Sequence, residues 1–302
     1  MSRCFHRALQ GIVLATILLS FVCCKTPPAS SIVELIKPAA SLEFISVEAR
    51  DISFLKLNYI LHIEYPGLIE AQVGIDKWSV TVNDKAVNIA PVFSLEKREG
   101  AYFFSVIGTE DKPAVMEIPV SLELDIPFLI AAGVPLTDDF TVALTLDLLN
   151  TNILGKPIRI QLSETAVFPF VREPIFSITG IAILQAELIN TRFSVYMRID
   201  NPNHFPVELS AFKYELYGNG RLWASGTERN MFTVPAKTSV IARLYVVMNF
   251  IDMDRNLLEQ IIRLESVNYR FNGEAFVSTG VDYLPSFTSG FDLSGYSEVL
   301  EN

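Results

Sequence analysis

Cysteine is nearly absent from this chain of 302 residues, which contains only three. All three, Cys4, Cys23 and Cys24, lie within the first 24 residues. The rest of the chain therefore has no thiols, which excludes a disulfide framework or a cysteine-ligated zinc site there. Because exported proteins usually use cysteine for disulfides, the adjacent pair Cys23 and Cys24 needs another explanation.

Histidine is equally scarce, with three residues at His6, His62 and His204. A metal site needs several nitrogen, sulfur or oxygen ligands that converge, and two distant histidines without thiols do not supply them. The sequence also lacks the G-x-S-x-G and H-E-x-x-H motifs and a phosphate-binding glycine loop. We therefore expect solvent-facing histidines, no cofactor, no metal, no small-molecule substrate and no enzymatic activity.

Positive charge is also limited, because 24 lysines and arginines stand against 34 aspartates and glutamates, a formal charge of −10. Nucleic-acid binding requires clustered basic residues, and attraction to anionic lipid requires the same, so neither is expected. Half of the residues are hydrophobic and only 19% are charged. This composition argues against disorder, and the length suits two β-sandwich cores better than one.

The N-terminal residues have the pattern of an export signal. Arg3 and Arg7 precede an apolar run over residues 11–22, which is too short to span a hydrocarbon core of ~30 Å comfortably. An uncleaved anchor is the alternative. The Cys23-Cys24 pair that follows resembles a bacterial lipobox, and this resemblance implies lipid attachment at Cys24, with Cys23 as the alternative. We predict a lipoprotein signal peptide over residues 1–23 and a proline-containing tether over residues 24–41.

The region from residue 193 to residue 226 carries the clearest structural pattern. A strand is predicted first, because side chains alternate between Phe193, Val195, Met197 and Ile199 on one face and Ser194, Tyr196, Arg198 and Asp200 on the other. Asn201-Pro202-Asn203 ends that strand. A second alternating run places Phe212, Tyr214 and Leu216 inward, and Gly218-Asn219-Gly220 predicts a tight hairpin turn. The partner strand then ends at Gly226.

This order of parts resembles the LEA type 2 family, also called the WHy domain. The matching residues are Asp200, Asn201, Pro202 and Asn203, the strand through Tyr214, the turn Gly218-Asn219-Gly220, and Ala224-Ser225-Gly226. The resemblance implies a fibronectin-III-like β-sandwich, a role linked to desiccation or water stress, and no catalysis. We interpret the motif residues as structural: Pro202 fixes the backbone, and Asn201 and Asn203 can bond backbone groups that have lost their ladder partners.

The preceding part of the chain reads as a degenerate copy of the same unit. With a shift of 136 positions, Leu57, Tyr59, Leu61 and Ile63 fall on the alternating core residues from 193 to 199, and Pro66 falls on Pro202. Asn83-Asp84 takes the place of the Gly-Asn-Gly turn. The predicted fold is therefore all-β, with two tandem fibronectin-III-like or immunoglobulin-like antiparallel sandwiches over residues 42–170 and 174–296, joined by a semi-rigid connector.

Each sandwich is expected to carry one short helix. Residues 127–135 predict the first, and residues 252–262 predict the second, with Asp252 or Asp254 as its N-cap. Asp138 and Asp139 are interpreted as turn residues and not as a calcium site. The chain after Tyr296 is expected to fray.

Together these features predict a non-enzymatic, membrane-anchored LEA type 2 lipoprotein of the cell envelope, facing the periplasm or the cell surface, with a protective or structural role. Its membrane contact would be the N-terminal lipid. The alternative is a binding module or adhesin that recognises a protein or glycan, for which Tyr196, Tyr217 and Trp223 are candidate aromatic contacts.

Overall fold

The computed structural model describes residues 38–301 except 67–69, 96, 99–100, 110–111, 152–156, 186–189, 219, 250–266 and 298. Within this part the chain is almost entirely β-strand, which confirms the all-β prediction. The first unit contains β1 (Ala39–Asp51), β2 (Phe54–Tyr65), β3 (Ala71–Val82), β4 (Lys85–Val87), β5 (Val92–Phe93), β6 (Lys97–Arg98), β7 (Ala101–Val106), β8 (Ala114–Asp125), α3 (Ile126–Ala131), β9 (Asp139–Thr151) and β10 (Ile158–Pro169).

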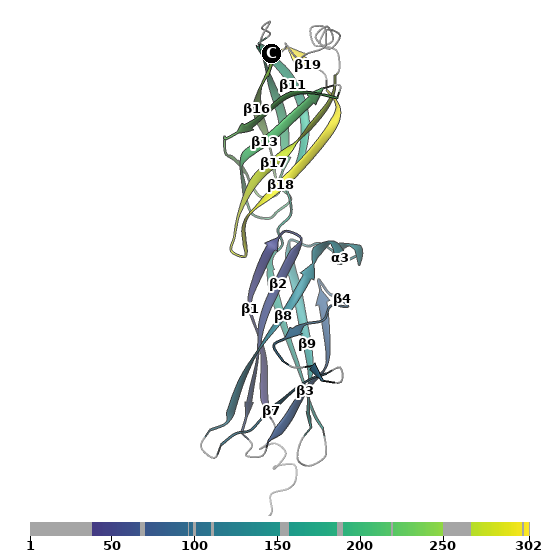
Figure 1. Ribbon diagram of the computed structural model, residues 1–302, viewed down its shortest axis with the longest axis vertical. Helices are drawn as coiled ribbons and strands as arrows, with labels where there is room; N and C mark the ends of the chain where they lie inside the picture. The colour runs from purple at the N-terminus through teal and green to yellow at the C-terminus, as the bar shows by residue number, and fades with distance from the viewer. Residues whose placement is uncertain are drawn as a thin grey trace, which may run out of the picture.

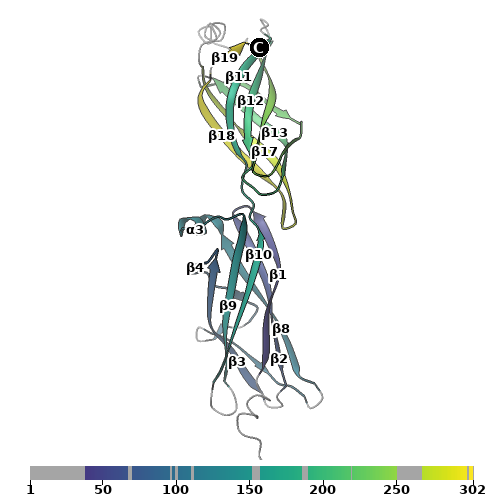
Figure 2. The same cartoon turned by 180° about the vertical axis from the view of Figure 1, so that it is seen from behind.

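A second unit follows directly and lies end to end with the first (Figure 1; Figure 2 shows the opposite side). It contains β11 (Ile175–Gln185), β12 (Asn190–Asp200), β13 (Val207–Gly218), β14 (Arg221–Glu228), β15 (Phe232–Val234), β16 (Ser239–Asn249), β17 (Val267–Val281), β18 (Leu284–Ser297) and β19 (Val299–Glu301). The predicted helix over residues 252–262 and the predicted cap Asp252 or Asp254 lie outside the described residues.

Each unit is built from two sheets in a sandwich-like arrangement. The first has the orders β1-β2-β8-β5 and β10-β9-β3-β7-β6, with β4 paired to β3. The second has β16-β12-β11-β19 and β14-β13-β17-β18, with β15 paired to β13. Among the described strands all pairs are antiparallel except β11 with β19. The order β1-β2-β8 in the first unit thus has the same form as β11-β12-β16 in the second.

The correspondence extends to the numbering of the first three strands in each unit. β1 and β11 start at positions 39 and 175, β2 and β12 at 54 and 190, and β3 and β13 at 71 and 207, so each pair of starts is 136 positions apart. The expected shift of 136 positions therefore aligns the starts of these three pairs of strands. Buried side chains on β2 and β12 also agree, since the alternating apolar residues of both strands lie in the interior.

Alternating side chains form the interiors of the two sandwiches, because successive residues of a strand point to opposite faces. Most of the buried apolar residues of the described chain fall into two separate clusters. One runs from Leu42 to Phe170 and the other from Phe176 to Phe291. Members that the alternation predicted include Leu57, Tyr59, Leu61, Ile63, Phe193, Val195, Met197, Ile199, Phe212, Tyr214 and Leu216.

Two hairpin turns have the backbone that their residues favour. Asn83 and Asp84 both adopt positive φ angles, 48° and 63°, between β3 and β4, and asparagine and aspartate tolerate this region best among residues with a side chain. In the second unit Gly220 has a φ of 79° between β13 and β14. Asn219 of this turn lies outside the described residues. A bulge at Ala211, φ 51°, shifts the pairing of β13 with β17.

Three expectations need correction. Ser194 lies on the polar face of β12, as the alternation predicted, but it is fully buried there and not exposed, and Arg243 donates from Nε to its Oγ at 2.5 Å. Trp223 is only 9% exposed and packs against Phe193, so it cannot serve as a surface contact. The chain does not fray after Tyr296, since β18 continues to residue 297 and β19 pairs with β11.

The short helix of the first unit forms at the predicted place but is shorter than expected, because it covers residues 126–131 and not 127–135. Asp125 caps it by accepting a hydrogen bond from the Phe128 backbone N–H at 2.9 Å. Pro127 fits in its first turn, where its missing N–H has no helical partner. No helix in the described ranges is long and apolar enough to span a membrane.

Candidate functional site

The Asn-Pro-Asn motif lies at the end of β12, where the second unit meets the first. Asn201 is 2% exposed, and its Nδ2 donates to the carbonyl oxygens of Phe205 at 2.8 Å, Val234 at 3.1 Å and Pro235 at 3.2 Å. Its Oδ1 accepts from the backbone N–H of Asn203 at 2.9 Å. A single buried amide therefore bonds three carbonyl groups and one backbone N–H around the turn.

Asn203 extends the network from the second unit to the connector. Its side chain is fully buried, and it pairs with the peptide groups of Arg172, donating from Nδ2 to the carbonyl oxygen at 2.9 Å and accepting at Oδ1 from the N–H at 2.8 Å. Arg172 lies between β10 and β11. The side-chain amide thus satisfies both backbone groups of a connector residue that belongs to neither sheet.

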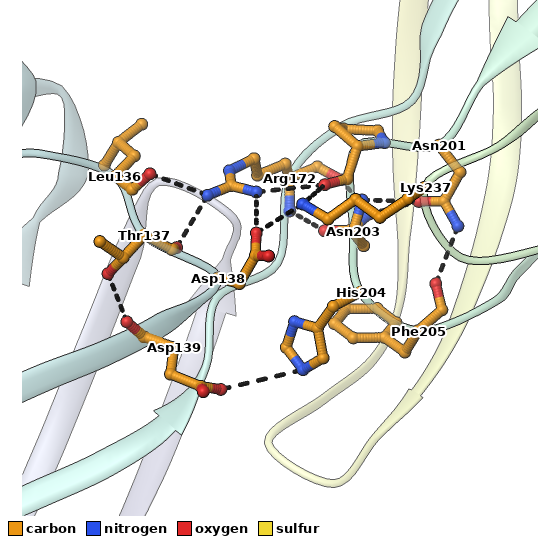
Figure 3. Close-up of polar contacts among 11 residues, drawn as sticks. Leu136, Thr137, Asp138, Asp139, Arg172, Asn201, Asn203, His204, Phe205 and Lys237 are labelled. Carbon is orange, nitrogen blue, oxygen red and sulfur yellow. Dashed lines mark hydrogen bonds and ion pairs between the residues drawn. The ribbon is translucent and has the colours of Figure 1, made fainter.

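The Arg172 guanidinium carries the contact onward into the first unit (Figure 3). Its Nη2 donates to the carbonyl oxygens of Leu136 at 2.9 Å and Thr137 at 2.7 Å, and its Nη1 lies 2.9 Å from Oδ1 of Asp138. The same Nη1 donates to the carbonyl oxygen of Pro202 at 3.1 Å. Because guanidinium holds its donors in a fixed plane, these four acceptors define one orientation of the units.

Lys237 supplies a second cation from the second unit. Its Nζ donates to Asp138 Oδ1 at 2.6 Å and to the Pro202 carbonyl oxygen at 2.8 Å. Asp138 therefore accepts from two cations, and hydrogen bonds from Lys237 and Arg172 lower its pKa to about 2. The carboxylate is charged at all physiological pH values. Asp138 was expected to be a turn residue, and its role in joining the units was missed.

The β17–β18 hairpin makes a further contact across the junction. The Tyr283 hydroxyl donates to the carbonyl oxygen of Pro169 at 2.5 Å, and its ring meets Phe168 edge to face with centroids 5.6 Å apart. Burial raises the pKa of Tyr283 to about 12, so the hydroxyl remains a donor. Nearby, buried Ser289 donates to Glu173 at 3.0 Å. The connector is therefore held by the second unit along its length.

Of the two histidines that the structure describes, His204 is exposed, as expected, whereas His62 is half-buried. His62 lies 3.3 Å from Glu43 and 3.6 Å from Glu117, and its side chain is 32% exposed. His204 follows the motif and lies 3.8 Å from Asp139 of the first unit. In the described ranges, no group of three or more histidine, cysteine, aspartate or glutamate side chains could hold a metal ion.

The glycine positions of the motif have separate packing reasons. A Cβ on Gly218 would lie 1.6 Å from the ring of Trp223, so only glycine lets this indole pack against the strand. A Cβ on Gly226 would lie 2.8 Å from the Tyr214 hydroxyl.

Asp200, another residue of the motif, makes a local ion pair with Arg198 at 2.8 Å. Cys23 and Cys24 lie outside the described residues.

Residues 196–285 match the family model described as late embryogenesis abundant protein, LEA type 2. The matched range contains the Asn-Pro-Asn turn, the glycine hairpin, Lys237 and Tyr283. This part of the chain belongs to the LEA type 2 family. The recognition made from the sequence is thereby confirmed for the second unit. Arg172 and Asp138, the main partners of the turn, lie outside the matched LEA type 2 range.

Several solved structures resemble the chain at low identity. A protein from Archaeoglobus fulgidus has 15% identity over 43% of this chain and 97% of its own, with a TM-score of 0.28. The periplasmic chaperone SfaE has 8% identity over 87% of this chain and 100% of its own, with a TM-score of 0.25. Red sea bream transglutaminase has 11% identity over 93% of this chain and 34% of its own, with a TM-score of 0.22. No curated protein matches the chain.

The side chains of the LEA type 2 motif form hydrogen bonds with other parts of the same chain. Asn201 donates to carbonyl groups of the second unit, and Asn203 bonds the connector residue Arg172. The Arg172 guanidinium in turn bonds the loop before β9. A sequence signal for this role existed in the connector, where Arg172 and Glu173 are the charged residues of a proline- and aromatic-rich segment. The partner Asp138 had no such signal.

Proposed function

We propose that the protein is a non-enzymatic, membrane-anchored LEA type 2 lipoprotein with a protective or structural role in the cell envelope, facing the periplasm or the cell surface. The family match over residues 196–285 carries this proposal. Lipid attachment at Cys24, or alternatively at Cys23, is supported by the cysteine pair directly after an apolar N-terminal run.

The position of the chain's ends supports a tethered arrangement. β1 starts at the end of the first unit that is remote from the second, because its other end meets β2 beside α3 and the junction (Figure 1). A lipid on Cys24 would therefore tether the chain through its first unit, with the LEA type 2 domain as the unit farther from the lipid. The network around Arg172 would keep that domain in one orientation.

We also propose that the first unit, residues 42–170, is a second, diverged copy of the LEA type 2 domain at residues 174–296. The 136-position spacing of three successive strand starts and the shared strand order support this. The family match stops short of the first unit. The divergence is visible at Tyr65-Pro66-Gly67, where the second unit has Asn201-Pro202-Asn203.

An alternative is an envelope binding module or adhesin for a protein or glycan. One observation favours it: Arg243 lies over the rings of Tyr196 and Tyr245, at 5.3 Å from each centroid, on the outer face of the β16-β12-β11 sheet. Tyr245 is 53% exposed. Replacing Tyr196 and Tyr245 by alanine should abolish glycan-array binding if this alternative holds, and an array without wild-type signal would remove the glycan form of it.

Detergent partitioning tests the anchor. The chain expressed with Cys23→Ser and Cys24→Ser together should leave the detergent phase, whereas the wild type should stay there. Single changes assign the site, since Cys24→Ser should release the protein and Cys23→Ser should not. A double variant that remains in the detergent phase with its N-terminal residues intact would show that the apolar run itself is the anchor.

Drying tests the protective role. A desiccation-sensitive enzyme dried with the protein should retain more activity than with an equal mass of the same protein after thermal unfolding. The unfolded sample is a matched control because its composition is identical. Equal protection by both samples, or by neither, would leave the structural role as the surviving form of the proposal.

A further inference from the structure

Residues 126–136 form a charge-free apolar projection beside the junction, which we call the α3 loop. It consists of α3 and the segment up to Leu136, with the sequence IPFLIAAGVPL. Phe128 is 49% exposed, Ile130 is 50% exposed and Leu136 is 37% exposed. Figure 1 shows α3 standing off the side of the first unit. Phe128 and Ile130 lie on either side of buried Leu129, so exposed apolar side chains flank this projection, and such surface marks an interaction site more often than a single exposed residue does.

The α3 loop is held in place by its buried side and by polar bonds from the β3–β4 hairpin. Ile126, Leu129 and Val134 are buried in the core of the first unit. Lys85 donates from Nζ to the carbonyl oxygens of Ala132 at 2.5 Å and Gly133 at 3.1 Å, which satisfies the C-terminal end of the helix.

Asn83 adds a bond from its Nδ2 to the Pro135 carbonyl oxygen at 2.7 Å. The core thus anchors one side of the loop while Phe128 and Ile130 stay outside it. Phe128 and Ile130 are therefore exposed on a segment that the core and these hydrogen bonds hold in place. A partner that takes up the loop would not have to order it first, which lowers the entropic cost of contact.

We propose that the α3 loop inserts into the boundary between headgroups and acyl chains of the bilayer to which the chain is tethered. The inference rests on the proposed lipid anchor, which keeps the first unit near a lipid surface. Insertion of this kind buries an apolar face by roughly 5–10 Å, a depth that a single loop with Phe, Ile and Leu can supply. It needs no positive charge, in agreement with a chain of net charge −10.

The length of the tether fits this contact. Fourteen positions separate Cys24 from Pro38, where the described chain begins, and an extended proline-containing segment of that length reaches ~43 Å at ~3.1 Å per residue. β1 has 13 residues, so it spans ~43 Å along the first unit at ~3.3 Å per residue. A first unit that lies along the membrane therefore brings the α3 loop to the surface within the reach of the tether.

A second copy of the chain is a poorer occupant. A stable protein interface buries about 800 Å² on each partner, from some 20–30 residues. The α3 loop offers three large exposed apolar side chains on 11 residues. This area is small for a dimer and sufficient for interfacial insertion.

Vesicle binding by the unlipidated chain tests the loop separately from the anchor. The protein is residues 24–302 with Cys24→Ser, which retains every residue that the structure describes. In this background Phe128→Trp places a reporter on the loop. With vesicles of phosphatidylcholine carrying brominated acyl chains, its emission should shift to shorter wavelength and be quenched. The matched control is Val115→Trp on β8, 68% exposed on the same unit, which should show neither change.

Substitution of the exposed apolar pair measures the contribution of the loop. Phe128→Ser with Ile130→Ser should lower the vesicle partition coefficient by about tenfold, because the variant no longer buries the apolar area of these two side chains on insertion. Far-UV circular dichroism and the melting temperature show whether the variant is folded. A salt-independent partition is expected, since charge does not drive it.

Three results would overturn the proposal. They are an emission spectrum of the Phe128→Trp protein that vesicles leave unchanged, equal quenching of the Phe128→Trp and Val115→Trp proteins, or a concentration-dependent dimer that the serine variant abolishes. The last would assign the loop to a second copy. None depends on lipidation, so failure of the Cys24 anchor in the detergent experiment remains a distinguishable outcome.

Discussion

The side chain of Asn203 pairs with the peptide groups of Arg172 as a neighbouring strand would, with hydrogen bonds of 2.9 and 2.8 Å in the two directions. Asn203 comes from the turn after β12, and Arg172 comes from the connector between the two sandwiches. The motif that identifies the LEA type 2 domain therefore also fixes the residue that leads into it. Arg172 then bonds Asp138, so the turn, the connector and the first unit form one network.

Replacing Asn203 by alanine should lower the free energy of unfolding by roughly 1–3 kcal/mol. The change leaves both backbone groups of Arg172 without a partner in a buried place and removes one of the two hydrogen bonds to Oδ1 of Asn201. Urea denaturation measures the loss. Asn230→Ala is the matched control, since Asn230 is exposed and its substitution should change stability by less than about 0.5 kcal/mol. Equal effects of the two changes would contradict the role of Asn203.

The contribution of Asp138 should depend on pH in a defined window. The two cations lower its pKa from 3.8 to about 2, so the folded state favours the ionised form. The stabilisation is therefore complete above about pH 4 and is lost as the pH falls through about 2. The urea midpoints of the wild type and Asp138→Asn should differ at pH 6 and converge towards pH 2. A difference that is the same at both pH values would show that Asp138 acts through packing and not through charge.

Gly218→Ala should destabilise the second unit although alanine adds only one methyl group. The new Cβ would lie 1.6 Å from the Trp223 ring, so the indole must leave its place against Phe193, at a cost of about 1–3 kcal/mol. Gly290→Ala is the control, because its Cβ would meet nothing closer than 3.8 Å. Thermal unfolding and tryptophan emission together test the prediction. An unchanged tryptophan spectrum in Gly218→Ala would contradict the packing that we describe.

Tyr283→Phe should weaken the junction without disturbing either core. It removes the donor to the Pro169 carbonyl oxygen and keeps the ring against Phe168, so a loss of about 0.5–1.5 kcal/mol is expected in urea denaturation. Tyr296→Phe, at a site 77% exposed, should have no measurable effect. Should the two variants unfold at the same midpoint, the hydroxyl bond would make no contribution to the junction.

Local patterns were sufficient to predict the strands. Strict alternation, as in Phe193 to Ile199, indicates which face of the strand is buried, and turn residues such as Asn83-Asp84 indicate where the chain reverses. Both signals are local in sequence, so they can be read without the fold. The buried state of Ser194 could not be read this way, since it depends on Arg243 from β16, 49 positions away.

The junction could be predicted only in part for the same reason. Burial and hydrogen bonding of Asn201 and Asn203 follow from their place in a turn that interrupts a ladder. The choice of Arg172 as the partner of Asn203, and of Asp138 as the acceptor for Lys237, depends on how two separate sandwiches meet. Lys237 and Asp138 are 99 positions apart, and no spacing rule connects them.

The most direct test of the account is the distance between the two units, measured by pulsed electron paramagnetic resonance. All native cysteines lie at positions 4, 23 and 24, so in the unlipidated chain with Cys24→Ser spin labels can be placed uniquely at Glu123→Cys on β8 and Thr288→Cys on β18, both exposed.

We predict one narrow distance distribution in this labelled chain. Adding Asn203→Ala and Asp138→Asn should broaden it while the circular dichroism spectrum still shows folded β-structure. A broad distribution in the parent, or an unchanged narrow one in the double variant, would contradict the claim that the Asn-Pro-Asn turn of the LEA type 2 domain holds the two sandwiches in one orientation.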